Sequence, residues 1–163
     1  INNVKNIVIL DGHGGQLKIV KEVITELETG KKTSTIKLLH LSPFNILPIE
    51  LLAKKIPLHE EAFVHAEEFE TSLMLSINPK AVKWKKAVKE IPPWIPTGLT
   101  HKNAQSIKRI LQTKSIGKNT RTGIIGDPTL ASRKKGQKTI RILTNALAKT
   151  IKKEFQNKRP KAL

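Results

Sequence analysis

The sequence contains no cysteine and no tyrosine. Without cysteine the chain forms no disulfide, no thiolate metal site and no cysteine nucleophile, so any metal that it binds must use His, Asp or Glu. There is also no run of about 18 apolar residues to span a bilayer, and no basic and then apolar segment typical of a signal peptide. We therefore expect a cytoplasmic protein that does not enter a membrane.

Acidic residues are scarce compared with basic ones. The 163 residues include 30 Lys and Arg but 13 Asp and Glu, which gives a formal net charge of +17. Such a charge attracts nucleic acids without specificity. However, no basic stretch is interleaved with the aromatic side chains that stack on single-stranded bases. A solvated, lysine-rich surface explains the charge better, and we do not expect specific nucleic-acid binding.

The length and the 38% of hydrophobic residues are those of one globular domain with one core. We assign residues 1–155 to this domain and residues 156–163 to a basic tail. The first residue is Ile1, and an apolar run begins close behind it. We interpret the chain as incomplete, with the N-terminal part of the fold missing.

The first 41 residues predict a strand, a helix and a second strand. The unbroken apolar run 5–10 is typical of a fully buried strand in a parallel sheet. Apolar residues at helical spacing predict a helix from Gln16 to Leu27, and Gly30 lies where a helix cap is expected. The β-branched and apolar run 33–41 predicts the next strand. A βαβ unit with a parallel sheet follows.

The rest of the chain predicts helices separated by proline-rich connections. We expect short helices at 49–54 and 103–111, the second inside a loop-rich stretch from Pro92 to Gly126. A longer helix from Ala66 should end at Pro79, with an inward face of Phe69, Leu73, Met74 and Ile77. The last helix should carry an inward stripe of Ile140, Leu143, Leu147, Ile151 and Phe155.

The motif DGHGGQ, residues 11–16, directly follows the first predicted strand. This places it at the carboxyl end of the strand, where open α/β sheets bind ligands. Its glycines allow tight backbone geometry and leave His13 as the large side chain of the turn. His13 is a candidate metal ligand, and a structural role in the loop is the alternative. A phosphate loop is disfavoured because neither GxGxxG nor GxxxxGK is present.

The motif HAEEFETSLML begins at His65 and contains three glutamates. Glu70 shares a helix face with apolar residues, and a buried carboxylate is costly unless a cation or metal pairs with it. Glu70 is therefore a candidate site residue. Glu67 and Glu68 lie in the first helical turn, where solvent exposure and a favourable helix dipole explain them. For His65, proton donation and a plain loop role both stay open.

A third motif, GDPTLAS, precedes the last predicted helix. Asp127 followed by Pro128 fits a helix cap with proline at the first position. A turn that positions the last helix accounts for these residues, so we favour a structural role over catalysis.

These three motifs, in this order, resemble the creatininase family of metal-dependent amidohydrolases. The family typically shows NGHGGN, a variant of HAGxxETSLML, and GDPxxA, which here read DGHGGQ, HAEEFETSLML and GDPTLA. The resemblance implies a three-layer α/β/α sandwich with a mainly parallel sheet. It also implies two divalent metal ions, zinc with manganese or iron possible, that activate a water molecule for amide hydrolysis.

The resemblance also implies roles for three single residues. His13 matches a metal-binding His, Glu70 matches a Glu that holds metal or water, and His65 matches a catalytic or substrate-binding His. The expected substrate is a small cyclic amide or formamide, and the expected assembly is a homo-oligomer. The alternative is a catalytically inactive remnant that acts as a basic binding module.

Several positions depart from the family pattern. The N-terminal motif that supplies a Glu, a His and a bridging Asp to the metals is absent. Asp11 and Gln16 each replace an Asn, and Glu67 replaces a small Gly beside the pocket. Gly15 stands where creatininase itself has a metal-binding Glu, which favours the deformylase-like branch of the family. This chain alone is not expected to build the full site.

Overall fold

The computed structural model describes residues 4–29, 36–98, 106–107, 109–111 and 115–156. The chain divides into two compact units, one of residues 1–47 with 143–163 and the other of residues 48–142. Within the described residues, no helix is long and apolar enough to cross a membrane. The assignment of residues 1–155 to one domain and 156–163 to a tail stays a prediction.

The first unit is a βαβ motif, as the sequence predicts. Strand β1 (Asn6–Leu10) leads through helix α1 (Leu17–Thr29) to strand β2 (Lys37–Leu41). The two strands are parallel, with Asn6 opposite Lys37 and Leu10 opposite Leu41. The start of the second predicted strand, residues 33–35, and the predicted cap Gly30 lie outside the described residues. A short helix α2 (Pro43–Ile46) follows β2.

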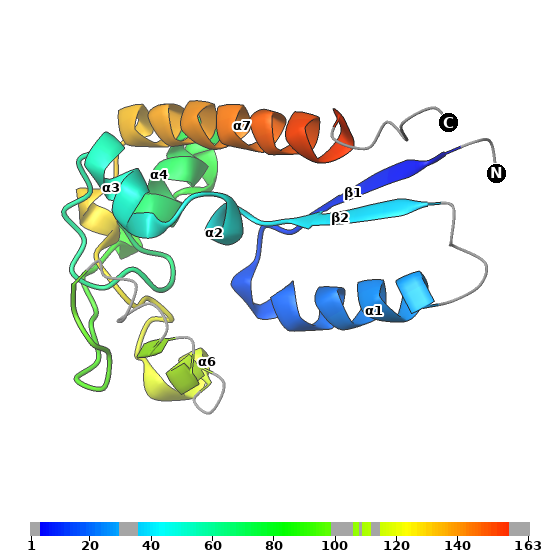
Figure 1. Ribbon diagram of the computed structural model, residues 1–163. Helices are drawn as coiled ribbons and strands as arrows, with labels where there is room; N and C mark the ends of the chain where they lie inside the picture. The colour runs from blue at the N-terminus through cyan, green and yellow to red at the C-terminus, as the bar shows by residue number, and fades with distance from the viewer. Residues whose placement is uncertain (1–3, 30–35, 99–105, 108, 112–114, 157–163) are drawn as a thin grey trace, which may run out of the picture. The chain divides into compact units, whose positions relative to one another are not determined.

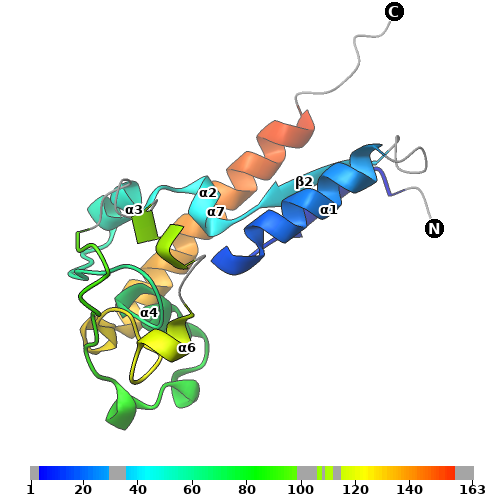
Figure 2. The ribbon, with the colours of Figure 1, turned by 90° about the horizontal axis from the view of Figure 1, so that it is seen from below.

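The strands lie between helices, which gives this unit an α/β/α layering. Figure 1 shows α1 along one face of the strands and the C-terminal half of helix α7 (Arg133–Gln156) along the other. Seen from below, α1 runs along β2, against which it packs (Figure 2). The α/β class with a parallel sheet is confirmed.

Strand β1 is less buried than its apolar sequence predicts. The side chains of Ile7 and Leu10 are 38% and 56% exposed, so the prediction of a fully buried strand is wrong for this structure. The reason is that the sheet has two strands within the described residues, so that β1 has β2 as its single neighbour. Parallel strands become buried on both faces only in wider sheets covered by helices.

The end of α7 is fastened to β2 through Lys37. The Lys37 ammonium group donates to the Glu154 carbonyl oxygen and lies 3.6 Å from Glu154 Oε2. It also lies 5.0 Å from the centre of the Phe155 ring, which is a cation–π contact. Phe155, predicted to face inward, is half-buried here.

The second unit consists of helices and irregular segments. Its helices are α3 (Ile49–Lys55), α4 (Glu68–Ile77), α6 (Ile116–Asn119) and the N-terminal half of α7, with 3₁₀ turns at Pro79–Ala81, Trp84–Lys86 and Pro128–Leu130. Residues 106–107 and 109–111 are helical, in agreement with the helix predicted there, whose residues 103–105 and 108 lie outside the described part. A hydrophobic cluster forms the core, made of Ala62, Ile95, Ile107 and Ile125.

The buried face of helix α4 agrees only in part with the predicted one. Phe69 is buried as predicted, but Met74 and Ile77, also expected inside, are 42% and 68% exposed, and Glu68, Ser72 and Leu75 are buried instead. The cause is close packing against α7, since a Cβ atom on Gly136 would lie 1.8 Å from the Ser72 carbonyl oxygen. This backbone contact places the side of α4 that carries Ser72 against α7. On α7, Ile140 is likewise exposed rather than inward.

Candidate functional site

His13 sits directly after β1 on a short 3₁₀ turn (Gly14–Gln16), for which it is the N-cap. The backbone N–H of Gly15 donates to His13 Nδ1 at 3.2 Å. A Cβ atom on Gly15 would lie 3.0 Å from His13 Cε1, so the ring occupies the space that glycine leaves free. Because Nδ1 accepts a hydrogen bond, Nε2 is the ring nitrogen left for a ligand, and the side chain is exposed to receive one.

Asp11, which the sequence interpretation left without a role, fixes the backbone of this turn. Its carboxylate is buried, and Oδ1 accepts the backbone N–H of His13 at 2.9 Å. Oδ2 lies 3.5 Å from Nε2 of His40 on β2. The spacing Asp-Gly-His is typical of an Asx turn, in which the side chain accepts from the backbone two residues on, and this signal could have found Asp11.

His65 and Glu70 lie together in the second unit. Glu70 Oε2 is 3.6 Å from His65 Nδ1 and accepts the backbone N–H of Ala66 at 2.6 Å. Between them Ala66 has a φ of 51°, a left-handed conformation that is uncommon outside glycine. His65 is held on its other side by an antiparallel bridge to Ile125. The fold thus places an imidazole and a carboxylate next to each other.

The burial expected for the three glutamates of this motif is reversed. Glu70, predicted inward, is 40% exposed at its side chain. Glu67 and Glu68, predicted to be solvent-exposed, are 1% and 0% exposed. The inward turn of α4 at Ser72 explains the exchange, since Glu68 lies one helical turn before Ser72 and shares its face. Glu70 remains accessible to a ligand, although the burial argument for its role is wrong.

Glu67 caps helix α4 from a buried position. Its carboxyl oxygens accept the backbone N–H groups of Phe69 at 2.6 Å and Glu70 at 3.2 Å. Desolvation by burial is the largest influence on this carboxyl group, and it raises the pKa of Glu67 to about 8. Glu67 is therefore neutral at pH 7, because the two capping hydrogen bonds do not outweigh the loss of water.

Two further buried carboxylates tie the surrounding loops together. Glu60 accepts four backbone N–H groups, from Glu61, Ala62, Glu68 and Asp127. Glu68 accepts the backbone N–H of His59 at 2.6 Å and pairs with the Lys135 ammonium group of α7. The charge of Glu68 is thus balanced by a cation.

The turn predicted at GDPTLAS is confirmed. Asp127 caps the 3₁₀ turn, accepting the backbone N–H of Thr129 at 2.9 Å, and Pro128 occupies its first position. Just before it, Gly126 has a φ of 140°, and a Cβ atom there would lie 2.4 Å from that of Glu67. The motif holds its loop against the capped end of α4, which is a structural role.

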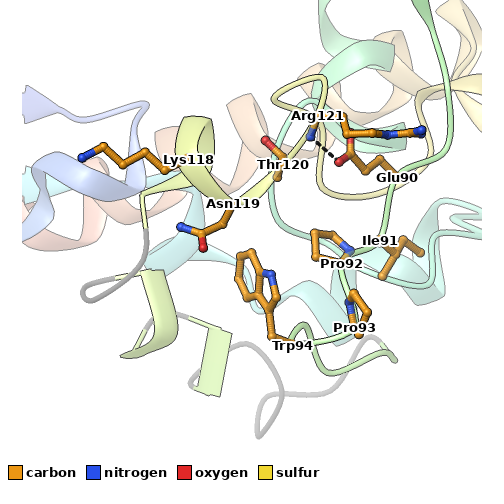
Figure 3. Close-up of a pocket in the computed structure, with 9 residues that line it drawn as sticks. All are labelled: Glu90, Ile91, Pro92, Pro93, Trp94, Lys118, Asn119, Thr120 and Arg121. Atoms are coloured by element: carbon orange, nitrogen blue, oxygen red, sulfur yellow. Dashed lines mark hydrogen bonds between the residues drawn. The ribbon is translucent and has the colours of Figure 1, made fainter.

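An open, shallow cavity of about 510 Å³ lies in the second unit. It is lined by Glu90, Ile91, Pro92, Pro93, Trp94, Lys118, Asn119, Thr120 and Arg121. Figure 3 shows the Trp94 ring and the Asn119 amide among the side chains that line it. Glu90 holds the 118–122 segment by accepting from the Thr122 hydroxyl and the Arg121 N–H, and these bonds lower the pKa of Glu90.

Backbone pairing connects Glu90, which lines the cavity, to His65 through the 125–126 segment. Gly126 pairs with Glu90 and its neighbour Ile125 pairs with His65, all antiparallel. The 125–126 segment therefore runs between His65 and Glu90. With adjacent strands about 4.8 Å apart, the backbones of His65 and Glu90 are separated by about 10 Å.

No cluster of three or more His, Asp or Glu side chains able to hold a metal is present among the described residues. His13 belongs to the first unit and His65 and Glu70 to the second. Their roles as metal ligand, proton donor and carboxylate ligand stay predictions. An accessible imidazole nitrogen and an accessible carboxylate are nevertheless the donor types that zinc and manganese take.

Comparison with known proteins gives one family. The model of the Creatininase family, described as creatinine amidohydrolase, matches residues 2–151. No curated protein matches the chain in sequence.

Among solved structures, a tryptophan mutant of creatininase superposes with a TM-score of 0.68 at 21% identity, covering 93% of this chain and 57% of its own. A creatininase mutant of the Zn–Zn type superposes with a TM-score of 0.64 at 22% identity, covering 93% of this chain and 57% of its own. A manganese creatininase superposes with a TM-score of 0.62 at 23% identity, covering 91% of this chain and 56% of its own. This chain thus spans little more than half the length of these structures.

Proposed function

The chain belongs to the creatininase family, and from this premise we propose that it is part of a metal-dependent amidohydrolase. The substrate in this proposal is a small cyclic amide or formamide, attacked by a metal-activated water. The observation that carries the proposal is the pairing of His65 with Glu70, 3.6 Å apart and both accessible to solvent. No membrane and no specific nucleic acid is involved, and a cytoplasmic homo-oligomer remains our prediction.

His65 and Glu70 have the geometry of a proton donor and its orienting carboxylate. Glu70 is itself fixed by the Ala66 N–H, so that it faces His65 Nδ1. This arrangement leaves His65 Nε2 as the nitrogen that would deliver a proton to the leaving amine. The left-handed Ala66 stores strain between them, which is common where function fixes the backbone.

His13 and Glu70 are the residues of this chain that would hold metal. His13 offers Nε2 and Glu70 offers Oε1, since their other atoms are engaged by Gly15 and Ala66. Bound divalent ions supply a water of lowered pKa and polarise a carbonyl. Zinc is our first choice, because a Zn–Zn creatininase shares the fold, with manganese or iron as alternatives.

The remaining ligands in this proposal come from outside the chain. A zinc site needs three or four ligands, and neither His13 nor Glu70 completes one. The solved creatininases are longer, and this chain covers 56–57% of three of them. We propose that an N-terminal part of the fold supplies the other ligands.

Metal analysis tests this proposal in the protein that carries this chain with any preceding sequence. His13→Ala should reduce bound zinc at least tenfold, as measured by inductively coupled plasma mass spectrometry. His59→Ala is the matched control, because the exposed His59 side chain makes no described contact near the motif, and its zinc content should equal that of the parent. Equal zinc in both variants would refute the assignment of His13.

Activity separates the roles of His65 and Glu70. His65→Gln should retain zinc but lose amide hydrolysis by about 10²-fold or more, as general-acid catalysis contributes about 10²–10⁴-fold. Glu70→Gln should lose both zinc and hydrolysis. Undiminished turnover of cyclic amides or formamides by His65→Gln would contradict its proton-donor role.

The cavity beside Glu90 is the candidate subsite for the rest of the substrate. Its volume suits a small molecule, and an aromatic wall together with an amide side chain suits a flat amide ring. The sequence holds two tryptophans and no tyrosine, so Trp84→Phe leaves Trp94 as the sole fluorophore of its class. Hydantoin, used as the probe, should quench this emission, and Asn119→Ala should weaken the quenching.

The competing function is an inactive basic module. Exposed Lys149, Lys152 and Lys153 near the end of α7 favour it. If these three contact phosphates of duplex DNA, the logarithm of the affinity should fall with the logarithm of salt concentration with a slope of about −3. Salt-dependent DNA binding by a protein without metal would support the module over the hydrolase.

A further inference from the structure

Two buried polar atoms of the first unit face each other, and neither has a hydrogen-bond partner among the described residues. Asp11 is 3% exposed, and its Oδ2 atom accepts no hydrogen bond within the described residues. His40, one of the more enclosed side chains of β2, has its Nε2 atom buried and also without a hydrogen bond among these residues. The two atoms are 3.5 Å apart. A buried carboxylate oxygen left alone is costly, so this pairing requires an explanation.

The strand register brings these two side chains together. Ile9 lies opposite His40 in the parallel pair, and Leu10 lies opposite Leu41. The N–H of Asp11 donates to the Leu41 carbonyl at 2.8 Å, which extends the ladder by one residue. Because side chains alternate along a strand, Asp11 points to the same face as Ile9, and therefore to the face of His40.

The other carboxylate oxygen of Asp11 controls the turn. Oδ1 accepts the N–H of His13 at 2.9 Å, so the carboxyl group connects β2 to the backbone of His13. The His13 ring is held separately by the Gly15 N–H. An aspartate has two equivalent oxygens and rotates about its side-chain bonds unless the second oxygen is also held. The His40 imidazole lies 3.5 Å from this second oxygen, on a residue whose position is fixed by the ladder.

We propose that His40 is a positioning residue for His13, acting through the Asp11 carboxylate. The imidazole fixes Asp11 Oδ2, and Asp11 Oδ1 fixes the His13 N–H. The backbone of His13 is thereby held in one conformation, and its ring projects from the end of β1 in a single direction. That the oriented His13 ring binds a metal rests on the proposed function, but its orientation by Asp11 and His40 does not. Without the imidazole, Asp11 turns toward water to recover its lost partner, and the His13 N–H loses its acceptor.

Hydrogen exchange measured by NMR on the full chain in a chelating buffer tests the positioning without metal. His40→Ala should speed exchange of the His13 amide at least tenfold, while the amides of Ile7 and Leu39, which donate within the ladder, keep their rates. His40→Gln places an amide nitrogen at the reach of the imidazole Nε2 and should restore the parental rate at His13. This conservative variant also keeps the test valid if His40→Ala fails to fold.

A double variant separates positioning from general stability. Asp11→Asn has a neutral side chain whose oxygen can accept from His13 without needing a cation or donor as a second partner. In this background His40→Ala should change His13 exchange less than threefold. Unchanged His13 exchange in the single His40→Ala variant, or equal acceleration at Ile7, Leu39 and His13, would overturn the proposal.

Zinc titration of the parental chain distinguishes this proposal from the proposed function. If ¹⁵N signals show zinc bound at His40 Nε2, then His40 is a ligand and the positioning role is wrong. If His40→Ala releases the His13 amide but His13→Ala keeps zinc in the longer protein, the positioning holds and the metal role of His13 fails. If His13→Ala loses zinc but His40→Ala leaves the exchange of the His13 amide unchanged, the metal role of His13 holds and the positioning role of His40 fails.

Discussion

Replacing Glu67 by glutamine should remove a large pH dependence from the stability of this protein. Burial raises the pKa of Glu67 to about 8, compared with 4.5 in the unfolded chain. Between these values the folded protein keeps a proton on Glu67 that the unfolded chain has released. The contribution of this proton to the free energy of unfolding is therefore fully present below pH 4.5 and is lost as the pH rises toward 8. For each pH unit in this interval, the folding equilibrium constant falls by up to tenfold. Over the whole interval the loss amounts to about 5 kcal/mol.

The Glu67→Gln variant carries no titrating group at position 67 and should lack this decline. Its one side-chain oxygen can accept only one of the two N–H groups, of Phe69 and Glu70, that Glu67 accepts, which costs about 1 kcal/mol at every pH. The parent should therefore be the more stable protein near pH 4.5. Because the parental advantage shrinks with each pH unit, the two stability curves should cross between about pH 5 and pH 6, and at pH 8 the variant should be the more stable.

Urea unfolding followed by circular dichroism from pH 5 to pH 8, with a chelator present, measures both curves. Subtracting one free energy of unfolding from the other cancels the contributions of the remaining titrating groups. Glu26→Gln, at an exposed position of α1, is the matched control and should leave the parental pH dependence unchanged. Parallel curves for the parent and Glu67→Gln would show that Glu67 is not held neutral in the fold.

Two packing predictions can be checked by the same unfolding assay. Gly136→Ala should destabilise by about 3 kcal/mol, because the added Cβ would lie 1.8 Å from a carbonyl oxygen of α4, whereas Gly117→Ala on α6 meets nothing within 4 Å and should change stability little. Lys135→Met should cost about 3–5 kcal/mol, since it leaves the buried Glu68 carboxylate without its cation, and Lys134→Met on the exposed face should stay within about 0.5 kcal/mol. Equal losses within either pair of variants would refute the packing that we describe.

The sequence by itself determined the local elements of this protein. Apolar runs and helical spacing identified the βαβ unit, α3 and the long last helix, because these patterns reflect backbone geometry over neighbouring residues. Asp127 and Pro128 were predicted as a cap for the same reason. The motif sequences also led to the creatininase family, which the match over residues 2–151 confirms.

Only the tertiary structure decided which side chains are buried and which polar groups meet. Helical spacing placed Glu70 inside, and the position of Glu68 in the first helical turn placed it outside, but the close approach of α7 to α4 reversed them. The partnership of Asp11 with His40 depends on a register between strands 26 residues or more apart in sequence. Burial and long-range pairing arise from packing between distant segments, and the periodicity of a single segment contains no information about its neighbours.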